Sequence, residues 1–395
     1  MSSERLDRVN GVTHAYVDTG KLPGVQTMIS RRGEIVHHDC YGFADVNTEV
    51  AVTAETIYRI YSMTKPITSV GLMMLFEEGH FLLENPVHRF LPEFTDVQVW
   101  DGGTADAPET RPPARAMTVH DVLTHLSGLT YGFHFQHPLD ELYRAHGLGD
   151  FSEPSFDLAE GVERMASLPL LFDPGTRWNY SMSTDVCGRL IEVMSGQPLD
   201  EFLRDRILDP LQMGDTGFHA PESDLGRCSP LYVRGADGSL KVMAPAQTMV
   251  EPPKFLSGGG GFVGTAPDYL RFCHMLANGG ELDGVRLLSP RTVRYMARNH
   301  LPDGKLLNEI GQSTFSEAAM EGTGFGLGLS IIEDAAALQN LASEGEFAWG
   351  GAASTAFWVD PAEDICAVFM TQLLPSDTYP IRRQLRAAVL QAVID

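Results

Sequence analysis

A serine and a lysine three positions apart are the sharpest chemical signal in this chain of 395 residues: Ser62-Met63-Thr64-Lys65. Residues three apart lie on one face of a helix, about one turn from each other, so the ammonium can reach the hydroxyl. The apolar spacing predicts a helix over 63–79 that ends at Gly79. Pro66 is tolerated in the first turn of a helix, which predicts a helix start close to Ser62. The positive end of the helix dipole would then face negative charge developing on a group bound at Ser62.

Two further motifs follow along the chain. Tyr180-Ser181 comes after the turn-forming segment Asp173-Pro174-Gly175, and Trp349-Gly350-Gly351 lies in a region of predicted strands. In this order and at these distances, the three motifs resemble those of the serine β-lactamase and penicillin-binding-protein superfamily. The sequence is most similar to the class C-like branch and, within it, to the family VIII carboxylesterases. The resemblance runs from about residue 10 to the C-terminus, with supporting segments at 123–129, 257–261 and 265–269.

The resemblance implies catalysis through an acyl-enzyme. Ser62 would be the nucleophile, and the backbone N–H groups of Ser62 and Ala352 would form the oxyanion hole. A serine hydroxyl needs a base at pH 7. Either Tyr180 serves as a phenolate stabilised by the charge of Lys65, or Lys65, desolvated and neutral, takes the proton itself. The residues leave both routes open, so Lys65 and Tyr180 are treated as one coupled titration.

The third motif departs from the β-lactamase pattern at its first position. In β-lactamases and penicillin-binding proteins a lysine stands there and grips the substrate carboxylate, whereas this chain has Trp349, with none of its other four lysines nearby. A neutral indole cannot pair with a carboxylate. By resemblance, Trp349, Gly350 and Gly351 would contact the substrate. Tyr131 would line the acyl or alcohol side, although anchoring its own loop explains this residue equally well.

These observations predict a serine carboxylesterase that hydrolyses short-chain, largely uncharged esters. The alternatives are a β-lactamase, a D-aminopeptidase or an acyltransferase of the same fold. A catalytically silent, ligand-binding member of the fold is disfavoured because Ser62, Lys65 and Tyr180 are all present. No G-x-S-x-G sequence occurs in the chain, which removes the usual α/β-hydrolase nucleophile elbow.

Strand patterns lie at both ends of the chain and helical patterns lie between them. Strands are predicted over 25–30, 35–41, 325–332, 354–359 and 365–373, and helices over 118–126, 157–167, 183–195, 199–207, 267–277 and 380–394. Polar segments at 101–116 and 148–156 are predicted loops. We expect an α/β (α+β) fold: a β-lactamase-like antiparallel sheet formed by the N- and C-terminal segments, flanked by helices, with a mostly helical inserted domain. The expected division is 1–66 with 250–395 against 67–249, with the active site between the two domains.

Charge and composition exclude several classes of partner. The chain has 29 Lys and Arg against 52 Asp and Glu, a net charge of −23, which disfavours nucleic acid and anionic membranes. No apolar run approaches the ~20 residues that span a bilayer, and the first residues lack the apolar core of a secretory signal, so we expect a cytoplasmic location. Five scattered cysteines match neither a disulfide framework nor a metal site, and we expect no metal and no cofactor. The expected partner is a small-molecule ester, and a homo-oligomer is left open.

Overall fold

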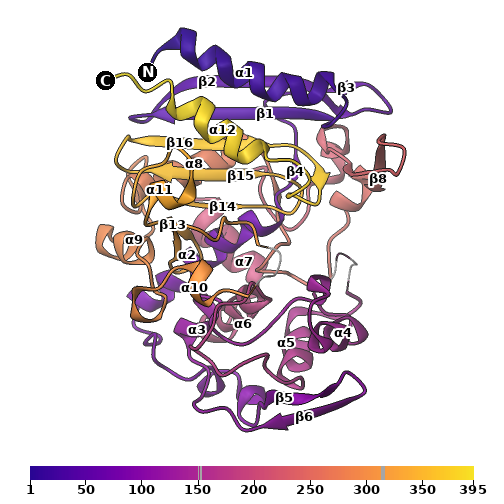
Figure 1. Cartoon of the computed structure of the whole chain (residues 1–395), viewed down its shortest axis with the longest axis vertical. Coiled ribbons are helices and arrows are strands. Elements are labelled where there is room, and N and C mark those ends of the chain that lie inside the picture. The colour runs from indigo at the N-terminus through magenta and orange to yellow at the C-terminus, as the bar shows by residue number, and fades with distance from the viewer. Residues whose placement is uncertain (150, 152–153, 313–315) are drawn as a thin grey trace.

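An eight-stranded antiparallel sheet forms the upper half of the molecule (Figure 1). The computed structural model describes the whole chain except residues 150, 152–153 and 313–315. The strand order is β12-β13-β14-β15-β16-β1-β2-β3, so strands from the two ends of the chain lie side by side. The bounds are β1 Gly24–Arg31, β2 Glu34–Asp45, β3 Val50–Ala51, β12 Thr323–Phe325, β13 Ser330–Ile332, β14 Phe347–Gly350, β15 Ala356–Asp360 and β16 Ile365–Met370.

Strands β1 and β16 join the two ends of the chain near the centre of the sheet. They pair antiparallel, with Met28 opposite Val368. All residues of both strands are buried, which explains why their sequences are nearly continuous apolar runs. Strand β1 continues into β2 through a tight turn at Arg32 and Gly33, whose φ values are 53° and 80°. Glycine adopts this left-handed conformation without a Cβ clash, which stabilises the hairpin.

Helices cover both faces of the sheet. Helices α1 (Ser3–Asp18) and α12 (Ile381–Leu390) pack together on one face, where Phe369 of β16 shares their apolar core. Helix α8 (Ala266–Ala277) packs against β15 and β16, and Val368 belongs to the core on that other side. Neighbouring residues of β16 thus serve opposite faces, as a pleated strand requires.

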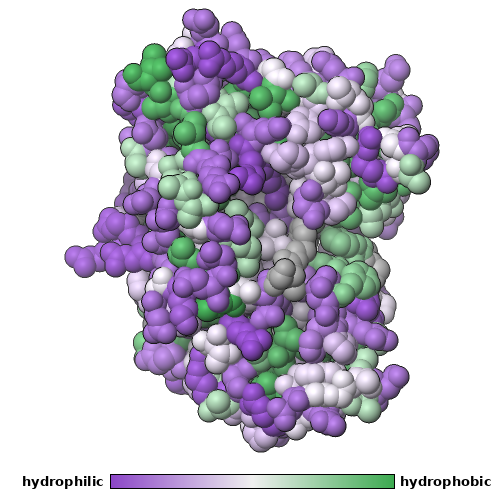
Figure 2. Space-filling model, in the orientation of Figure 1, coloured by the Kyte–Doolittle hydropathy of each residue, from purple (hydrophilic) through white to green (hydrophobic). Residues whose placement is uncertain are grey.

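The lower half of the molecule is mostly helical (Figure 1). Its centre is the packing of α2 (Thr64–Glu77) against α6 (Ser183–Ser195). The surrounding helices are α3 Val119–Leu123, α4 Pro138–Ala145, α5 Leu158–Ala166 and α7 Leu199–Leu203, which continues as a π-helical turn at Arg204–Leu208. Figure 2 shows that the surface is hollowed at mid-height, between the sheet and this helical part. The predicted division into 1–66 with 250–395 and 67–249 stays a prediction.

The structure differs from the predicted elements in several places, and helices α4 and α9 (Pro290–Met296) are among the elements that were not predicted. The single strand predicted over 325–332 is a hairpin of β12 and β13, because Gly328 has a φ of 86° and turns the chain there. The predicted loop at 101–116 contains much of the hairpin of β5 (Val99–Thr104) and β6 (Ala107–Arg111). A further hairpin of β7 (Leu231–Arg234) and β8 (Leu240–Ala244), extended by β17 (Leu373–Leu374), was not predicted. Among the described residues, no helix has the length and apolarity needed to cross a membrane.

Candidate active site

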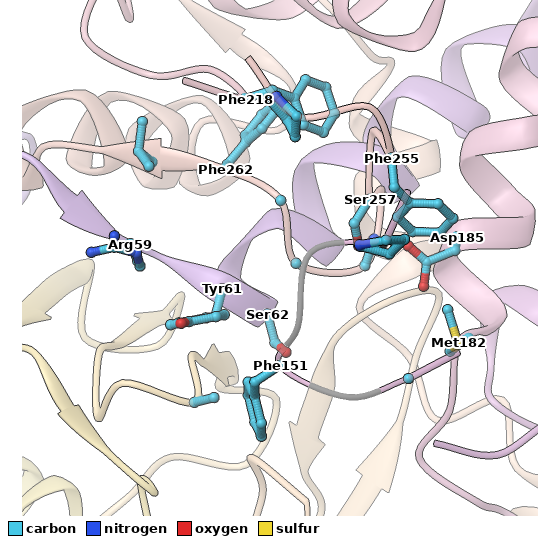
Figure 3. Close-up of a pocket in the computed structure, with 18 of the residues that line it drawn as sticks. Arg59, Tyr61, Ser62, Phe151, Met182, Asp185, Phe218, Phe255, Ser257 and Phe262 are labelled. Carbon is cyan, nitrogen blue, oxygen red and sulfur yellow. Dashed lines mark hydrogen bonds between the residues drawn. The ribbon is translucent and has the colours of Figure 1, made fainter. Parts of the chain in front are cut away.

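Ser62 lies at an aromatic cavity of about 460 Å³. This volume is within the range of small-molecule sites. Phe151 and Tyr61 meet edge to face with ring centroids 6.0 Å apart, and Figure 3 shows Phe218 and Phe262 on another side of the cavity and Phe255 on a third. The remaining aromatic residues of the lining are Tyr131, Phe133 and Tyr180. The site therefore suits a substrate with a substantial apolar part.

A short helical turn presents the Ser62 hydroxyl. Tyr61–Met63 form a single 3-10 turn that leads directly into α2, and Ser62 is 9 % exposed. Tyr61, directly before it, has a φ of 43°, an uncommon conformation for a residue with a large side chain. Pro66 falls in the first turn of α2, as the sequence predicts. The arrangement brings the nucleophile to the N-terminal end of a buried helix, where backbone N–H groups point outward.

Lys65 is fully buried directly beside Ser62. Its Nζ lies 3.2 Å from Ser62 Oγ, 2.9 Å from Tyr131 Oη and 2.5 Å from the carbonyl oxygen of Gly259. Burial lowers the pKa of Lys65 from 10.5 to about 7, although the carboxylates of Asp185 and Glu317 partly oppose this change. A substantial fraction of Lys65 is therefore neutral at pH 7 and able to accept a proton.

Tyr180, which lies 118 positions further along the chain, contacts the same hydroxyl. Its Oη lies 2.5 Å from Ser62 Oγ, and Lys65 Nζ lies 4.6 Å from the centre of its ring. The backbone of Tyr180 is fixed by His134, whose Nε2 donates to the Tyr180 carbonyl oxygen at 2.7 Å. Burial raises the pKa of Tyr180 well above its usual value, and the Glu317 carboxylate adds to that effect. A free phenolate is thus strongly disfavoured, whereas neutral Lys65 is readily available.

Tyr131 lies in the cavity wall and contacts Lys65. It is 7 % exposed, lines the cavity and accepts a hydrogen bond from Lys65 Nζ. Burial also raises the pKa of Tyr131 well above its usual value, so the hydroxyl stays protonated. Tyr131 thus lies in the cavity wall, and its contact with the substrate stays a prediction.

Asp185 is a buried member of the site that the sequence analysis missed. It lies on α6, and its Oδ1 accepts hydrogen bonds from Ser257 Oγ at 2.6 Å and from the N–H of Gly259 at 3.1 Å. The carbonyl oxygen of Gly259 in turn accepts a hydrogen bond from Lys65. The Asp185 carboxylate thus fixes the loop that contacts the lysine. Burial raises the pKa of Asp185. The run of glycines at 258–261 was a visible signal, because a Cβ at Gly258 would meet Thr68 of α2 and Thr184 of α6, and a Cβ at Gly259 would meet Asp185 itself.

The turn after β14 carries the predicted second oxyanion donor. Ala352 and Ser62 both line the cavity. Within the described part of the chain, neither backbone N–H donates a hydrogen bond to the protein, which leaves both for a substrate oxygen. Gly351 is needed for the close approach, because a Cβ there would collide with the carbonyl oxygen of Ile60, two residues before Ser62. The predicted oxyanion donors therefore share one site with the predicted nucleophile.

Trp349 does not take the position that the sequence predicted for its side chain. The ring is 2 % exposed and packs edge-on against Tyr180 and Phe325, with centroid distances of 5.5 and 5.4 Å. Trp349, Gly350 and Gly351 are not among the described residues that line the cavity, whereas Ala352 is. Strand alternation and the packing of the large indole ring turn it toward the core. The indole thus packs against the ring of Tyr180 and is not among the described residues that form the cavity wall.

An ion pair beneath the third motif was also missed. Arg382 of α12 donates to Glu317 at 2.7 Å, and Glu317 lines the cavity while its side chain is wholly buried. Arg382 lies 33 positions beyond Trp349 in the sequence, so its proximity to the third motif was not predicted. Its charge is committed to Glu317, so the cavity still presents no free cation at this motif among the described residues.

Comparison with known proteins identifies the family. The Beta-lactamase family model matches residues 9–391, and the chain belongs to this family. It is 30 % identical over 381 residues to Esterase EstB of Burkholderia gladioli, covering 92 % of this chain and 89 % of EstB. It is 36 % identical to Protein Rv1367c of Mycobacterium tuberculosis, with 94 % and 90 % covered. These matches span nearly the whole chain.

A solved structure supports the same assignment. EstCE1, described as a hydrolase with promiscuous acyltransferase activity, superposes with a TM-score of 0.83 at 26 % identity, covering 98 % of this chain and 99 % of EstCE1. The predicted superfamily and the α/β fold of the β-lactamase type are confirmed. The protein is thus a hydrolase of the β-lactamase fold. The finer placement beside the family VIII carboxylesterases stays a prediction.

Proposed function

We propose that this protein is a serine carboxylesterase that hydrolyses largely uncharged esters of small carboxylic acids through an acyl-enzyme on Ser62. The observation that carries the proposal is the convergence on Ser62 Oγ of Tyr180 Oη at 2.5 Å and Lys65 Nζ at 3.2 Å, beside an aromatic cavity. The likeness to Esterase EstB supports an ester as the substrate. No nucleic acid, membrane or cofactor enters the proposed reaction, and we propose a cytoplasmic location.

Acylation uses the buried pair as its base. Ser62 Oγ attacks the ester carbonyl carbon while its proton passes to the Lys65–Tyr180 pair, in which neutral Lys65 is the favoured acceptor. The carbonyl oxygen becomes an oxyanion and accepts hydrogen bonds from the N–H groups of Ser62 and Ala352. The bond from carbon to the alcohol oxygen then breaks. The pair returns the proton to that oxygen, so the alcohol leaves and the acyl group stays on Ser62.

Deacylation repeats the same steps with water. A water molecule gives a proton to the Lys65–Tyr180 pair and attacks the acyl carbon, and the same two N–H groups stabilise the second tetrahedral intermediate. The bond from the acyl carbon to Ser62 Oγ then breaks. The proton returns to Ser62, and the carboxylic acid leaves, which restores the free enzyme.

Charge in and around the cavity supports an uncharged substrate. Asp185 and Glu317 line the cavity, and Arg382 near the third motif is paired with Glu317. Arg59 and Lys254 also line the cavity, but a penicillin carboxylate would find no free cation at the third motif among the described residues, and the chain's charge of −23 would slow its approach. A neutral ester has neither disadvantage, and the aromatic lining favours its apolar part.

The test is hydrolysis of nitrophenyl acetate and nitrophenyl butyrate by the wild type and by Ser62→Ala. We expect hydrolysis by the wild type and its loss in Ser62→Ala. Retained activity in that variant would rule out the mechanism. A comparison of kcat/KM for nitrophenyl butyrate and nitrocefin then separates esterase from β-lactamase, because the missing carboxylate anchor should penalise the lactam.

Acyl transfer to an alcohol is a second candidate. EstCE1, which superposes over nearly the whole chain, is described as having promiscuous acyltransferase activity. The cavity of about 460 Å³ has room for an acceptor alcohol beside a small acyl group. If the acyl-enzyme is attacked by added alcohol, the ratio of new ester to free acid rises with alcohol concentration. Product analysis by chromatography measures this ratio.

A further inference from the structure

Arg382 makes an unusual set of contacts directly beneath the turn that carries Ala352. Its Nη2 donates to the carbonyl oxygens of Gly351 at 2.7 Å and of Thr355 at 2.6 Å, while its Nη1 donates to Glu317 Oε2 at 2.7 Å. The guanidinium is 20 % exposed and Glu317 is wholly buried. One side chain from the C-terminal helix thereby clamps both ends of the turn.

The clamp acts on the peptide unit of the oxyanion donor. The carbonyl oxygen of Gly351 and the N–H of Ala352 belong to the same planar, trans peptide, so they point in opposite directions. Because Arg382 holds that oxygen, the orientation of the Ala352 N–H is fixed as well. A charged donor on the carbonyl also polarises the peptide and strengthens its N–H as a donor. Ala352 lines the cavity, and its N–H donates to no backbone acceptor among the described residues, so it is available to a substrate oxygen.

Glycine at position 350 makes room for the clamp. A Cβ there would lie 2.6 Å from the Arg382 guanidinium, so a larger residue would displace either the strand or the arginine. Gly351 N–H donates to Thr355 at 2.9 Å, which closes the turn that Arg382 holds from outside. The Arg382 guanidinium thus explains the glycine at position 350. The carbonyl oxygen of Ile60, in the segment that leads to Ser62, explains the glycine at position 351.

Glu317 keeps Arg382 in place. Its Oε2 accepts from Arg382 and from Ser376 Oγ at 3.1 Å, whereas its buried Oε1 has no partner among the described residues. A single carboxylate oxygen therefore anchors the guanidinium while leaving its other nitrogen aimed at the turn. The pair also cancels a charge that would otherwise lie close to the cavity.

We infer that Arg382, held by Glu317, is a positioning residue that aims the Ala352 N–H at the transition-state oxyanion. The inference rests on the proposed function, in which Ser62 forms the acyl-enzyme. It predicts that the pair contributes to the rate of the chemical steps and contributes little to binding of the ester. If the pair had a merely structural role, its variants would change the stability of the protein without a selective effect on the chemical steps.

The test compares Arg382→Gln, Arg382→Lys and Glu317→Gln in nitrophenyl ester hydrolysis and in inhibition by phenylboronic acid. The boronate adds to a serine hydroxyl as a tetrahedral anion, which needs the same two N–H donors. We expect Arg382→Gln to lower kcat by about 10- to 100-fold with KM changed less than about threefold, and to weaken boronate inhibition by a similar factor. Arg382→Lys should recover part of the loss, because an ammonium reaches one carbonyl but cannot bridge three partners.

Matched variants separate the outcomes. Arg383→Gln, on the neighbouring position of α12, removes the same charge away from the turn and should leave kcat unchanged. If Ser62→Ala keeps its activity, the proposed function fails. If Ser62→Ala is inactive but all three variants of the pair keep wild-type kcat and boronate affinity, only this inference fails. If Arg382→Gln does not fold, Arg382→Lys and Glu317→Gln decide by the same two readouts.

Discussion

The buried ammonium of Lys65 predicts a defined pH dependence of catalysis. Burial lowers its pKa from 10.5 to about 7, and the proposed base is the neutral amine. The value of kcat/KM should therefore rise with pH, reach half its plateau near pH 7 and lie about 100-fold below the plateau at pH 5. An unperturbed lysine would leave only about one molecule in 3000 neutral at pH 7. The assay is hydrolysis of a nitrophenyl ester at subsaturating concentration between pH 5 and pH 8.5, corrected for spontaneous hydrolysis.

A variant of a neighbouring carboxylate tests the assignment of that midpoint. Asp185 stabilises the charged form of Lys65, so removal of its charge should lower the pKa of Lys65 further. In Asp185→Asn the midpoint should move to lower pH, while the amide oxygen can still accept from Ser257. Asp364→Asn, in an exposed turn with a φ of 52°, removes the same charge far from the site and should leave the midpoint in place. A flat profile, or an equal midpoint in all three proteins, would refute the role of Lys65 as the base.

Three further predictions follow from the packing of the site. Tyr180→Phe should lower kcat by about 100- to 10,000-fold because it removes the hydroxyl that contacts Ser62. Tyr131→Phe loses only a contact to Lys65 and should lower kcat by less. Equal losses in the two variants would contradict this order. Gly350→Ala should lower kcat in the same assay, since its Cβ would meet the Arg382 guanidinium, while wild-type kcat would show that the turn tolerates the displacement. Trp349→Lys should destabilise the protein by about 3 kcal/mol or more in thermal unfolding without any gain in nitrocefin hydrolysis, because the new ammonium would be buried behind Tyr180. A stable variant that gains nitrocefin hydrolysis would contradict the buried position of the indole.

The centre of the proposed catalytic site could be predicted from the sequence because its spacing is local. Ser62 and Lys65 are one helical turn apart, and Pro66 marks the start of their helix. Tyr180 was predicted from its place in the order of motifs, and the structure brings its hydroxyl to Ser62. A helix start and one buried turn are enough to position these side chains, and both features can be recognised in the sequence.

The groups that tune and support this core leave no such pattern. Asp185, Glu317 and Arg382 are single charged residues whose partners lie 31 to 72 positions away, so only the folded chain shows that they meet. The orientation of Trp349 was likewise not predictable, because a four-residue strand buried on both faces carries no alternation of apolar and polar residues.

The fold shows the same distinction between buried and exposed elements. The central strands β1 and β16 are buried on both faces and were predicted from their apolar runs. The hairpin of β5 and β6 is mostly exposed, so its sequence resembles a polar loop. Its pairing depends on backbone hydrogen bonds, which do not require apolar side chains, and Pro108 lies at one of the paired positions, opposite Gly103. An exposed hairpin is therefore hard to recognise in the sequence, although helix α4, which buries Leu139 and Tyr143, was not predicted either.

The central claim is that the Ser62 hydroxyl becomes covalently acylated. The most direct measurement is the intact mass of the protein after treatment with a fluorophosphonate, followed by peptide mapping of the modified residue, for the wild type and Ser62→Ala. We expect one added phosphonyl group on Ser62 in the wild type and none in the variant. An unmodified wild type, or the same modification in Ser62→Ala, would contradict the claim.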